Sequence, residues 1–238
     1  MARSKIVVIT GATSGIGAAV TTAFCQPGTR VFLIGRNDRT LTRTAHKIPS
    51  HNLSGVARAD LGSVTDVRTL LTTLSQCLSH VDVLVLAAGE YGWTELGSLE
   101  TDGFDSLFAV NVRAPYLLTQ GLLPLLKRAR GQVIFINSSV VRSPGAGVAA
   151  YKATQHAMQG LVDSLRQDLN RHGIRVSSLF PGQTATARLP RIYAKQGKRY
   201  QPWKLMSARD VAQIVRALTE LPSGVEITDL HLRSPTPY

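Results

Sequence analysis

The residues Lys5-Ile6-Val7-Val8-Ile9-Thr10-Gly11-Ala12-Thr13-Ser14-Gly15-Ile16-Gly17 combine an apolar run with a glycine-rich turn. Its apolar first half predicts a buried strand, and the residues from Gly15 to about Gln26 predict a helix that stops at Pro27-Gly28. The glycines between them permit a tight turn, in which backbone N–H groups approach a phosphate at the positive end of the helix. An ordinary tight connection would also carry glycines. The position of this turn, between the first strand and the first helix, favours a dinucleotide-binding unit.

The rest of the chain repeats the alternation of strand and helix. Apolar strands are predicted at 30–35, 53–58, 81–87, 132–137, 174–180 and 225–232, and helices at about 38–48, 63–79, 101–112, 114–129, 148–172 and 207–221. Strands that are apolar on both faces indicate a mainly parallel sheet covered by helices on each side. Right-handed crossovers then give a Rossmann-like, doubly wound α/β sandwich of three layers, with its ligand at the carboxyl ends of the strands.

Composition bounds the class of protein. The 238 residues are 44% hydrophobic and 18% charged, which excludes a disordered chain, and we find no repeat or linker, so we expect a single domain over 1–238. No apolar run approaches the roughly 20 residues of a membrane span. Cys25 and Cys77 have no metal or redox spacing, and the start of the chain shows no signal-peptide pattern. We expect a reduced, cytoplasmic protein with no metal site and no membrane partner.

The charge balance is unusual. Lys and Arg number 27 against 15 Asp and Glu, a formal net charge of +12. Between Asp168 and Asp210 there is no acidic residue at all. Such an excess raises the question of nucleic acid, but no helix-turn-helix, zinc or RNA-binding aromatic motif is present, so we expect none. Two readings stay open: a solvated basic loop, and a loop that attracts an anionic ligand.

The spacing of the turn leads to a family. Thr10–Gly17 has the form TGxxxGxG and resembles the short-chain dehydrogenase/reductase family. Asp60-Leu61 after the third strand, Asn111 in Asn-Val-Arg-Ala-Pro, Ser138 thirteen residues before Tyr151, and Pro181–Thr186 match further family motifs. The resemblance runs from about residue 5 to 232 and implies an oxidoreductase that uses a nicotinamide cofactor.

The sequence departs from the family pattern in two places. Leu86-Ala87-Ala88-Gly89 stands where the family has Asn-Asn-Ala-Gly, which alters local hydrogen bonding on the adenosine side. The family's Tyr-x-x-x-Lys reads Tyr151-Lys152-Ala153-Thr154-Gln155, so a glutamine occupies the lysine position.

The resemblance implies a role for each matching residue. Tyr151 donates the proton and Ser138 bonds the carbonyl oxygen; neighbouring Ser139 is the alternative, but successive residues point opposite ways, so only one faces the site. Asn111 positions a water in the proton relay, and Gln155 bonds the nicotinamide ribose. The full set expected at the cofactor is Gly11, Thr13, Ser14, Gly15, Ile16, Gly17, Arg36, Asn37, Asp60, Leu61, Ala88, Gly89, Tyr151, Gln155, Pro181, Gly182, Thr184 and Thr186.

The end of the second strand predicts the form of the cofactor. An acidic residue there would bond the ribose 2′-OH of NAD, but the chain reads Gly35-Arg36-Asn37. A guanidinium pairs with a 2′-phosphate, so we predict NADP(H); the alternative is an arginine that merely faces solvent.

Position 155 predicts the direction of the chemistry. Residues four apart share a helix face, whereas Lys152 lies roughly 100° around from Tyr151 and is a poor substitute for the missing lysine. Without that charge Tyr151 stays protonated at neutral pH, which favours a slow, reduction-biased enzyme. A cofactor-binding protein with lost or non-redox activity is the alternative.

The substrate is predicted only as a class. We expect a ketone or aldehyde, small or carrier-bound, under a basic substrate flap at about 187–206 that also carries Tyr193, Tyr200 and Trp203. If the flap attracts anions, the substrate carries a carboxylate, a phosphate or an acidic carrier. The resemblance implies a homodimer or homotetramer that pairs through the helices at 114–129 and 148–172.

Overall fold

A parallel sheet forms the centre of the protein in a computed structural model that describes residues 3–93, 96, 98, 100–143 and 145–236. Within these residues the sheet has seven strands in the order β3-β2-β1-β4-β5-β6-β9. The strands are β1 (Lys5–Thr10), β2 (Thr29–Gly35), β3 (Leu53–Arg58), β4 (Val83–Leu86), β5 (Gln132–Ile136), β6 (Arg175–Pro181) and β9 (Asp229–Leu232). All six strand pairings are parallel, and β1 pairs with both β2 and β4, so the winding reverses there. The predicted doubly wound sandwich is confirmed.

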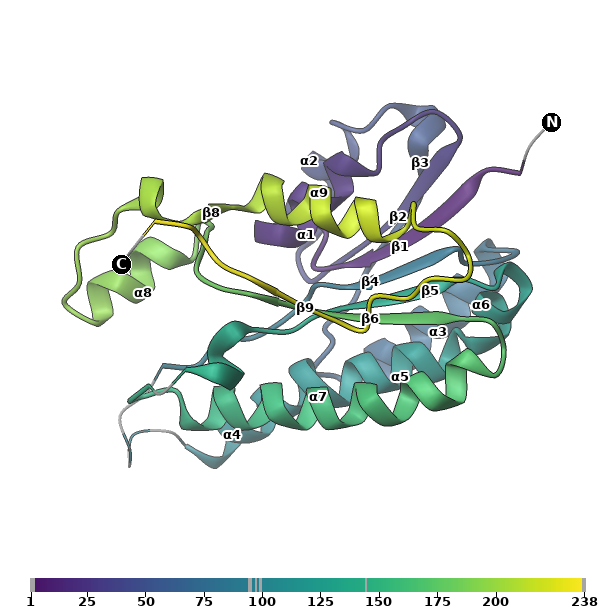
Figure 1. Ribbon diagram of the computed structural model, residues 1–238. Helices are drawn as coiled ribbons and strands as arrows, with labels where there is room; N and C mark the ends of the chain where they lie inside the picture. The colour runs from purple at the N-terminus through teal and green to yellow at the C-terminus, as the bar shows by residue number, and fades with distance from the viewer. Residues whose placement is uncertain (1–2, 94–95, 97, 99, 144, 237–238) are drawn as a thin grey trace.

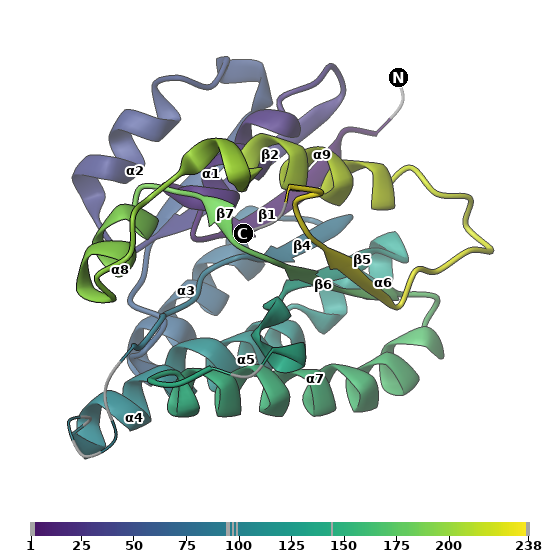
Figure 2. The ribbon, with the colours of Figure 1, turned by 60° about the vertical axis from the view of Figure 1, so that its left-hand side comes forward.

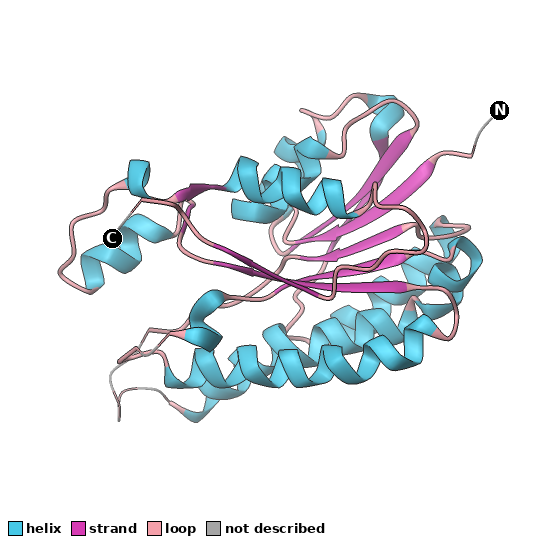
Figure 3. Cartoon of the chain, in the orientation of Figure 1, coloured by secondary structure: helices cyan, strands magenta, loops and turns pink. Residues whose placement is uncertain are grey.

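Helices cover both faces of the sheet (Figures 1 and 2). One layer holds α1 (Gly15–Ala23), α2 (Asp38–Ala45) and α9 (Ala208–Leu218). The other layer holds α3 (Val64–Cys77), α4 (Thr101–Phe108), α5 (Ala114–Gly121), α6 (Leu123–Ala129) and α7 (Ala149–Asn170). Figure 3 shows the strands running between these layers. No helix in the described part of the chain has the length and apolar character needed to cross a membrane.

Two apolar cores, one on each face of the sheet, explain why the strands read as unbroken hydrophobic runs. Val8 and Leu84 belong to the core beneath α3, α5 and α7, whereas Val7 and Val85 belong to the core beneath α1 and α9. Successive strand residues point to opposite faces, so both parities must be apolar when both faces are buried. The sheet is thereby held rigidly from both sides, which fixes the positions of the strand ends.

The predicted helix at 114–129 is broken in the structure. It divides at Leu122 into α5 and α6, because Pro124 cannot donate a backbone hydrogen bond to the preceding turn. The predicted helix at 101–112 likewise ends its α-helical part at Phe108 and continues as a π-helix, η2 (Ala109–Arg113). The last strand is shorter than predicted, since only Asp229–Leu232 pairs with β6.

The segment after β6 contains more structure than the sequence predicts. A two-stranded ladder of β7 (Thr184–Ala185) and β8 (Met206–Ser207) closes the base of the flap, which contains the helix α8 (Leu189–Lys195) and the short 3-10 helix η4 (Pro202–Lys204). In Figure 1 the flap lies beyond the carboxyl ends of the strands. Two further 3-10 helices, η1 (Ser50–Asn52) and η3 (Ser139–Arg142), precede β3 and follow β5.

Candidate active site

The glycine-rich turn joins β1 to α1 and packs against the end of β4. Gly11 and Gly15 have φ of 65° and 53°, a region that favours glycine. A Cβ at Gly17 would lie 2.2 Å from the Gly11 carbonyl oxygen, and one at Gly11 would lie 2.9 Å from the Ala88 Cα. These close approaches require glycine at both positions and bring the turn beside the segment that follows β4.

The first turn of α1 is left open to an anion. The Ser14 side chain accepts no hydrogen bond from the helix, and the first turn contains no acidic residue. In contrast, Asn37, Ser63 and Ser207 cap α2, α3 and α9 by accepting from a backbone N–H three residues on. The positive end of the α1 dipole therefore has no side-chain cap, as a bound pyrophosphate would require.

Gly35 stands at the end of β2, where the acidic residue of an NAD site would stand, and a side chain there would be crowded. A Cβ there would lie 3.1 Å from the Thr13 Cγ2 and 3.2 Å from the Leu41 Cδ2. Arg36 follows with a side chain 68% exposed, and its Nη1 lies 3.4 Å from the Glu90 Oε1. This long ion pair holds the guanidinium loosely beside Glu90 in the segment after β4. Asn37, predicted at the cofactor, uses its side-chain oxygen to accept from the Thr40 N–H at 3.0 Å.

Thr10 organises the departure from the family pattern after β4. Its Oγ1 accepts from the backbone N–H groups of Ala87 and Ala88, each at 3.0 Å. The backbone of this segment is thus held from β1. Nearby, the Asp60 Oδ1 accepts from the Gly62 N–H at 3.0 Å, and Leu61 is buried at 8% exposure.

Ser138 and Tyr151 meet at the end of β5. The Tyr151 side chain hydrogen bonds with Ser138, so Ser138 rather than Ser139 faces the predicted acid. Ser138 is oriented in turn, because its N–H donates to the Asn137 Oδ1 at 2.7 Å and its Oγ accepts from the Val140 N–H at 3.2 Å. The two residues that the sequence separates by thirteen positions therefore form one polar pair.

The surroundings of Tyr151 keep its hydroxyl protonated. Burial raises the pKa of Tyr151 above its usual value, while the Ser138 hydrogen bond and the Arg188 guanidinium act in the opposite direction. The ring of Tyr91 packs edge-on against the Tyr151 ring at 4.8 Å between centroids. The phenol is therefore an acid rather than a base in the neutral range.

Asn111 links α7 to the segment after β4 from within the π-helix η2. Its Oδ1 accepts from the Glu90 N–H at 2.8 Å, and its Nδ2 donates to the Glu90 carbonyl at 2.9 Å and to the Thr154 Oγ1 at 3.1 Å. The Thr154 hydroxyl donates to the Tyr151 carbonyl at 2.7 Å. Single-turn π-helices recur at functional sites, and this one directs a buried amide toward the helix that carries Tyr151.

Gln155 occupies the lysine position as a buried, neutral group. It is 3% exposed, and its Nε2 lies 3.3 Å from the Thr154 Oγ1. The backbone carbonyl of Gln155 accepts a hydrogen bond from the Asn137 Nδ2 at 3.1 Å. Lys152 does not replace the missing cation, because its Nζ donates to the Ser143 carbonyl at 2.9 Å and so extends toward η3.

The segment Pro181–Thr186, at the base of the flap, contacts the glycine-rich turn. The Thr186 Cγ2 would lie 3.3 Å from a Cβ at Gly15, and the Gly182 N–H donates to the Leu232 carbonyl at 2.8 Å. The Thr184 hydroxyl donates to the Gly182 carbonyl at 3.0 Å. The structure thus packs Thr186, at the end of this segment, against Gly15 of the glycine-rich turn.

A family model described as short chain dehydrogenase matches residues 5–197. The chain belongs to the short-chain dehydrogenase/reductase family. An uncharacterized oxidoreductase of Staphylococcus epidermidis is 29% identical over 97% of each chain. An alcohol dehydrogenase from the archaeon Thermococcus sibiricus, solved with 5-hydroxy-NADP, is 26% identical with a TM-score of 0.87 over 99% of each chain. A metagenomic short-chain oxidoreductase, solved with NADP, is 27% identical with a TM-score of 0.81 over 96% of this chain and 97% of its own.

Four residues of this family member's site were missed by sequence reasoning. Asn137, Thr154, Tyr91 and Arg188 reach the Ser138–Tyr151 pair or its supports through contacts described above. Asn137 could have been found, because it directly precedes Ser138. The other three carry no local pattern, and only the fold brings them to the site.

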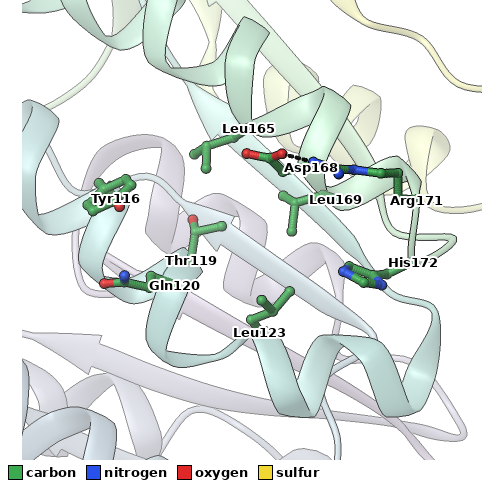
Figure 4. A pocket seen from close by; sticks show the side chains of 9 residues that line it. All are labelled: Tyr116, Thr119, Gln120, Leu123, Leu165, Asp168, Leu169, Arg171 and His172. Atoms are coloured by element: carbon green, nitrogen blue, oxygen red, sulfur yellow. Dashed lines mark hydrogen bonds and ion pairs between the residues drawn. The ribbon is translucent and has the colours of Figure 1, made fainter.

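A pocket lies away from this site, between α5, α6 and the C-terminal half of α7 (Figure 4). Leu123 and Leu165 point into it, and Asp168 and Arg171 form an ion pair at its rim. Tyr151 stands at the opposite end of α7, so this pocket takes no part in the arrangement around the phenol.

In the described residues we find no group of three or more His, Cys, Asp or Glu side chains that could hold a metal ion.

Proposed function

We propose that this family member is an NADP(H)-dependent oxidoreductase that reduces the carbonyl of a ketone or aldehyde. The observation that carries the proposal is the hydrogen-bonded pair of Ser138 and Tyr151, which stands at the carboxyl edge of the sheet, where Ser138 follows β5. Ligands of open parallel sheets bind at this edge. A hydroxyl pair at this place can orient a carbonyl oxygen and deliver a proton to it.

The chain's own residues would perform three tasks in such a reaction. Ser138 donates a hydrogen bond to the carbonyl oxygen, and Tyr151 transfers its proton to that oxygen as negative charge develops there. Asn111 and Thr154 hold the start of α7 against the segment after β4, which keeps the phenol in place. A bound reduced nicotinamide would supply the hydride to the carbonyl carbon. Because burial raises the pKa of Tyr151, the phenol is poised to give a proton rather than to take one.

The preference for NADPH rests on the end of β2. Gly35 supplies no carboxylate for a ribose 2′-OH, and the exposed Arg36 can exchange its long contact with Glu90 for a 2′-phosphate. The open first turn of α1 suits the pyrophosphate of the same molecule. The archaeal and metagenomic neighbours were both solved with NADP or a derivative of it, which supports this assignment.

The substrate is proposed to carry negative charge or to be presented by an acidic carrier. Arg191, Lys195, Lys198 and Arg199 are exposed along the flap, and no acidic residue lies between Asp168 and Asp210. A concentrated positive field attracts anions and raises their encounter rate. The proposal includes the homodimer or homotetramer expected for the family, which would pair through the helices at 114–129 and 148–172. Tyr116 on α5, in the first of these helices, is 38% exposed.

One observation favours a second candidate, a cofactor-binding protein without turnover. Gln155 is buried and neutral where the family carries a lysine, and its amide contacts Thr154. The experiment that separates the two candidates measures cofactor binding by calorimetry and turnover by the near-ultraviolet absorbance of the reduced cofactor, against a panel of ketones and aldehydes.

In that experiment we expect NADPH to bind more tightly than NADH and to be oxidised by at least one carbonyl. Tyr151→Phe and Ser138→Ala should retain cofactor binding and lose turnover by about 100-fold or more, because both groups act on the reacting oxygen. Tyr116→Phe is the matched control, since Tyr116 lies on α5 and lines the pocket beside the C-terminal half of α7, whereas Tyr151 stands at the start of that helix. Cofactor binding without oxidation by any carbonyl would favour the second candidate, and equal turnover in Tyr151→Phe would refute the first.

A further inference from the structure

An ion pair joins the two strand ends on either side of the glycine-rich turn. The central strand β1 pairs with β2 on one side and with β4 on the other. Arg36 directly follows β2, and Glu90 lies in the segment that follows β4. The Arg36 Nη1 and the Glu90 Oε1 are 3.4 Å apart. The pair therefore links the two flanks of β1 at the carboxyl edge of the sheet, where ligands of such sheets bind.

Glu90 is the fixed member of this pair. Its backbone N–H donates to the Asn111 Oδ1 at 2.8 Å, and its backbone carbonyl accepts from the Asn111 Nδ2 at 2.9 Å. The Ser106 hydroxyl donates to the Oε2 of the carboxylate at 2.8 Å. The preceding residue is held as well, because the Gly89 carbonyl accepts from the Arg188 Nη2 at 3.1 Å. These contacts tie Glu90 and its neighbour to η2, to α4 and to the flap.

Arg36 is the movable member of the pair. Its side chain is 68% exposed, against 33% for Glu90, and 3.4 Å is long for a charge-assisted hydrogen bond. In the part of the chain that the structure describes, Glu90 is the one carboxylate within ion-pair distance of Arg36. The guanidinium can therefore turn to another anion, whereas the carboxylate stays in place.

We infer that Glu90 sets the affinity of the protein for the 2′-phosphate of NADP(H) by competing for the Arg36 guanidinium. The inference rests on the cofactor assignment in the proposed function and extends it to a second residue. The carboxylate engages the cation that a 2′-phosphate needs, so binding of the phosphate must first break the pair. NADH carries a hydroxyl at this position and has no need to displace Glu90.

A carboxylate in this place opposes an anionic ligand in two ways. It holds the cation that the ligand needs, and it repels the ligand directly. Salt weakens both effects, because the pair is exposed to solvent. The two effects can be told apart, since competition requires Arg36 and direct repulsion does not.

The test is a calorimetric titration at low ionic strength with NADPH, NADH and adenosine 2′,5′-bisphosphate, which carries the 2′-phosphate without the nicotinamide. Glu90→Gln removes the charge and keeps an acceptor for the Ser106 hydroxyl. We expect NADPH and the bisphosphate to bind this variant about 2- to 5-fold more tightly, the range for loss of one exposed ion pair, and NADH to bind as to the wild type. The gain should disappear at high salt.

Two further comparisons make the test specific. In an Arg36→Ala background we expect Glu90→Gln to give no gain, because the contested cation is absent. Asp105→Asn is the matched control, since it removes one exposed carboxylate next to Ser106 on α4 and should leave all three dissociation constants in place. Glu90→Ala removes the same charge in a second way, and circular dichroism verifies the fold of each variant.

Unchanged NADPH binding in both Glu90→Gln and Glu90→Ala would overturn the inference. A gain of equal size in the Arg36→Ala background would mark direct repulsion instead of competition and would also overturn it, as would an equal gain in Asp105→Asn. Weaker binding of both NADPH and NADH to Glu90→Gln would identify Glu90 as a ligand of the cofactor, which again contradicts the inference. A protein that binds as expected but reduces no carbonyl would refute the proposed function and leave this inference standing.

Discussion

Gln155→Lys tests how the site sets the direction of its chemistry. In the wild type, burial raises the pKa of Tyr151, so the phenol is protonated in the neutral range and the phenolate needed to oxidise an alcohol is scarce. Residue 155 lies one helical turn from Tyr151 on α7, where side chains four positions apart are roughly 6 Å from each other. A lysine there would place an ammonium beside the phenol.

The magnitude follows from this spacing. Two unit charges about 6 Å apart attract by about 3 kcal/mol at an effective dielectric constant of about 20. That energy corresponds to a downward shift of about two pH units in the ionisation of the phenol. Position 155 is 3% exposed, so burial of the ammonium removes part of the gain. We therefore expect the alkaline limb of alcohol oxidation to move one to two pH units lower, which is about a 10- to 100-fold gain in kcat/KM at a fixed pH on that limb.

The assay compares pH–rate profiles for carbonyl reduction by NADPH and for alcohol oxidation by NADP⁺ in the wild type and in Gln155→Lys. Reduction at neutral pH should change little, because Tyr151 is protonated in both proteins there. Gln159→Lys is the matched control, since it adds the same charge one turn farther along α7. A folded Gln155→Lys protein that binds NADPH but keeps the wild-type oxidation profile would refute the reasoning, as would an equal shift in the control.

The remaining predictions concern the cofactor, the flap and the support of the site. Arg36→Ala should weaken NADPH binding by about 10- to 100-fold, the cost of lost bonds to a charged group, and should leave NADH binding unchanged; calorimetry with both cofactors measures this, and an equal loss for both would contradict it. Reversing the charges of Lys195, Lys198 and Arg199 should raise KM for an anionic carbonyl substrate and flatten its dependence on salt, whereas a KM that is insensitive to both salt and charge reversal would identify the flap as merely solvated. Asn111→Ala should lower the free energy of unfolding by about 2–4 kcal/mol, because it leaves the Glu90 N–H and carbonyl unpaired; denaturant unfolding against Asn170→Ala, which loses one exposed bond, checks this, and equal losses would argue against it.

Local pattern was enough to predict most of the fold. Glycine, proline and the alternation of apolar runs located every strand of the central sheet, because burial on both faces demands apolar residues at every position of a strand. The errors occurred where tertiary context decides. Pro124 divides a helix whose composition reads as continuous, and only four residues of the predicted last strand find a partner in β6. The π-helix around Asn111 could not be predicted from the local sequence. The Asn111 side chain within it contacts Glu90 and Thr154, which are distant in the sequence.

The site divides in the same way. Ser138 and Tyr151 could be paired from the sequence, because their interval fixes a strand end relative to a helix start and both lie on rigid elements. The contact between Arg188 and the Gly89 carbonyl could not be predicted, because it depends on the path of the flap and on the ladder of β7 and β8 at its base. In the sequence Arg188 is one of nine basic residues between Asp168 and Asp210. The direction of Lys152 was equally hidden in the sequence, because its ammonium extends to the Ser143 carbonyl although it is the next residue after Tyr151.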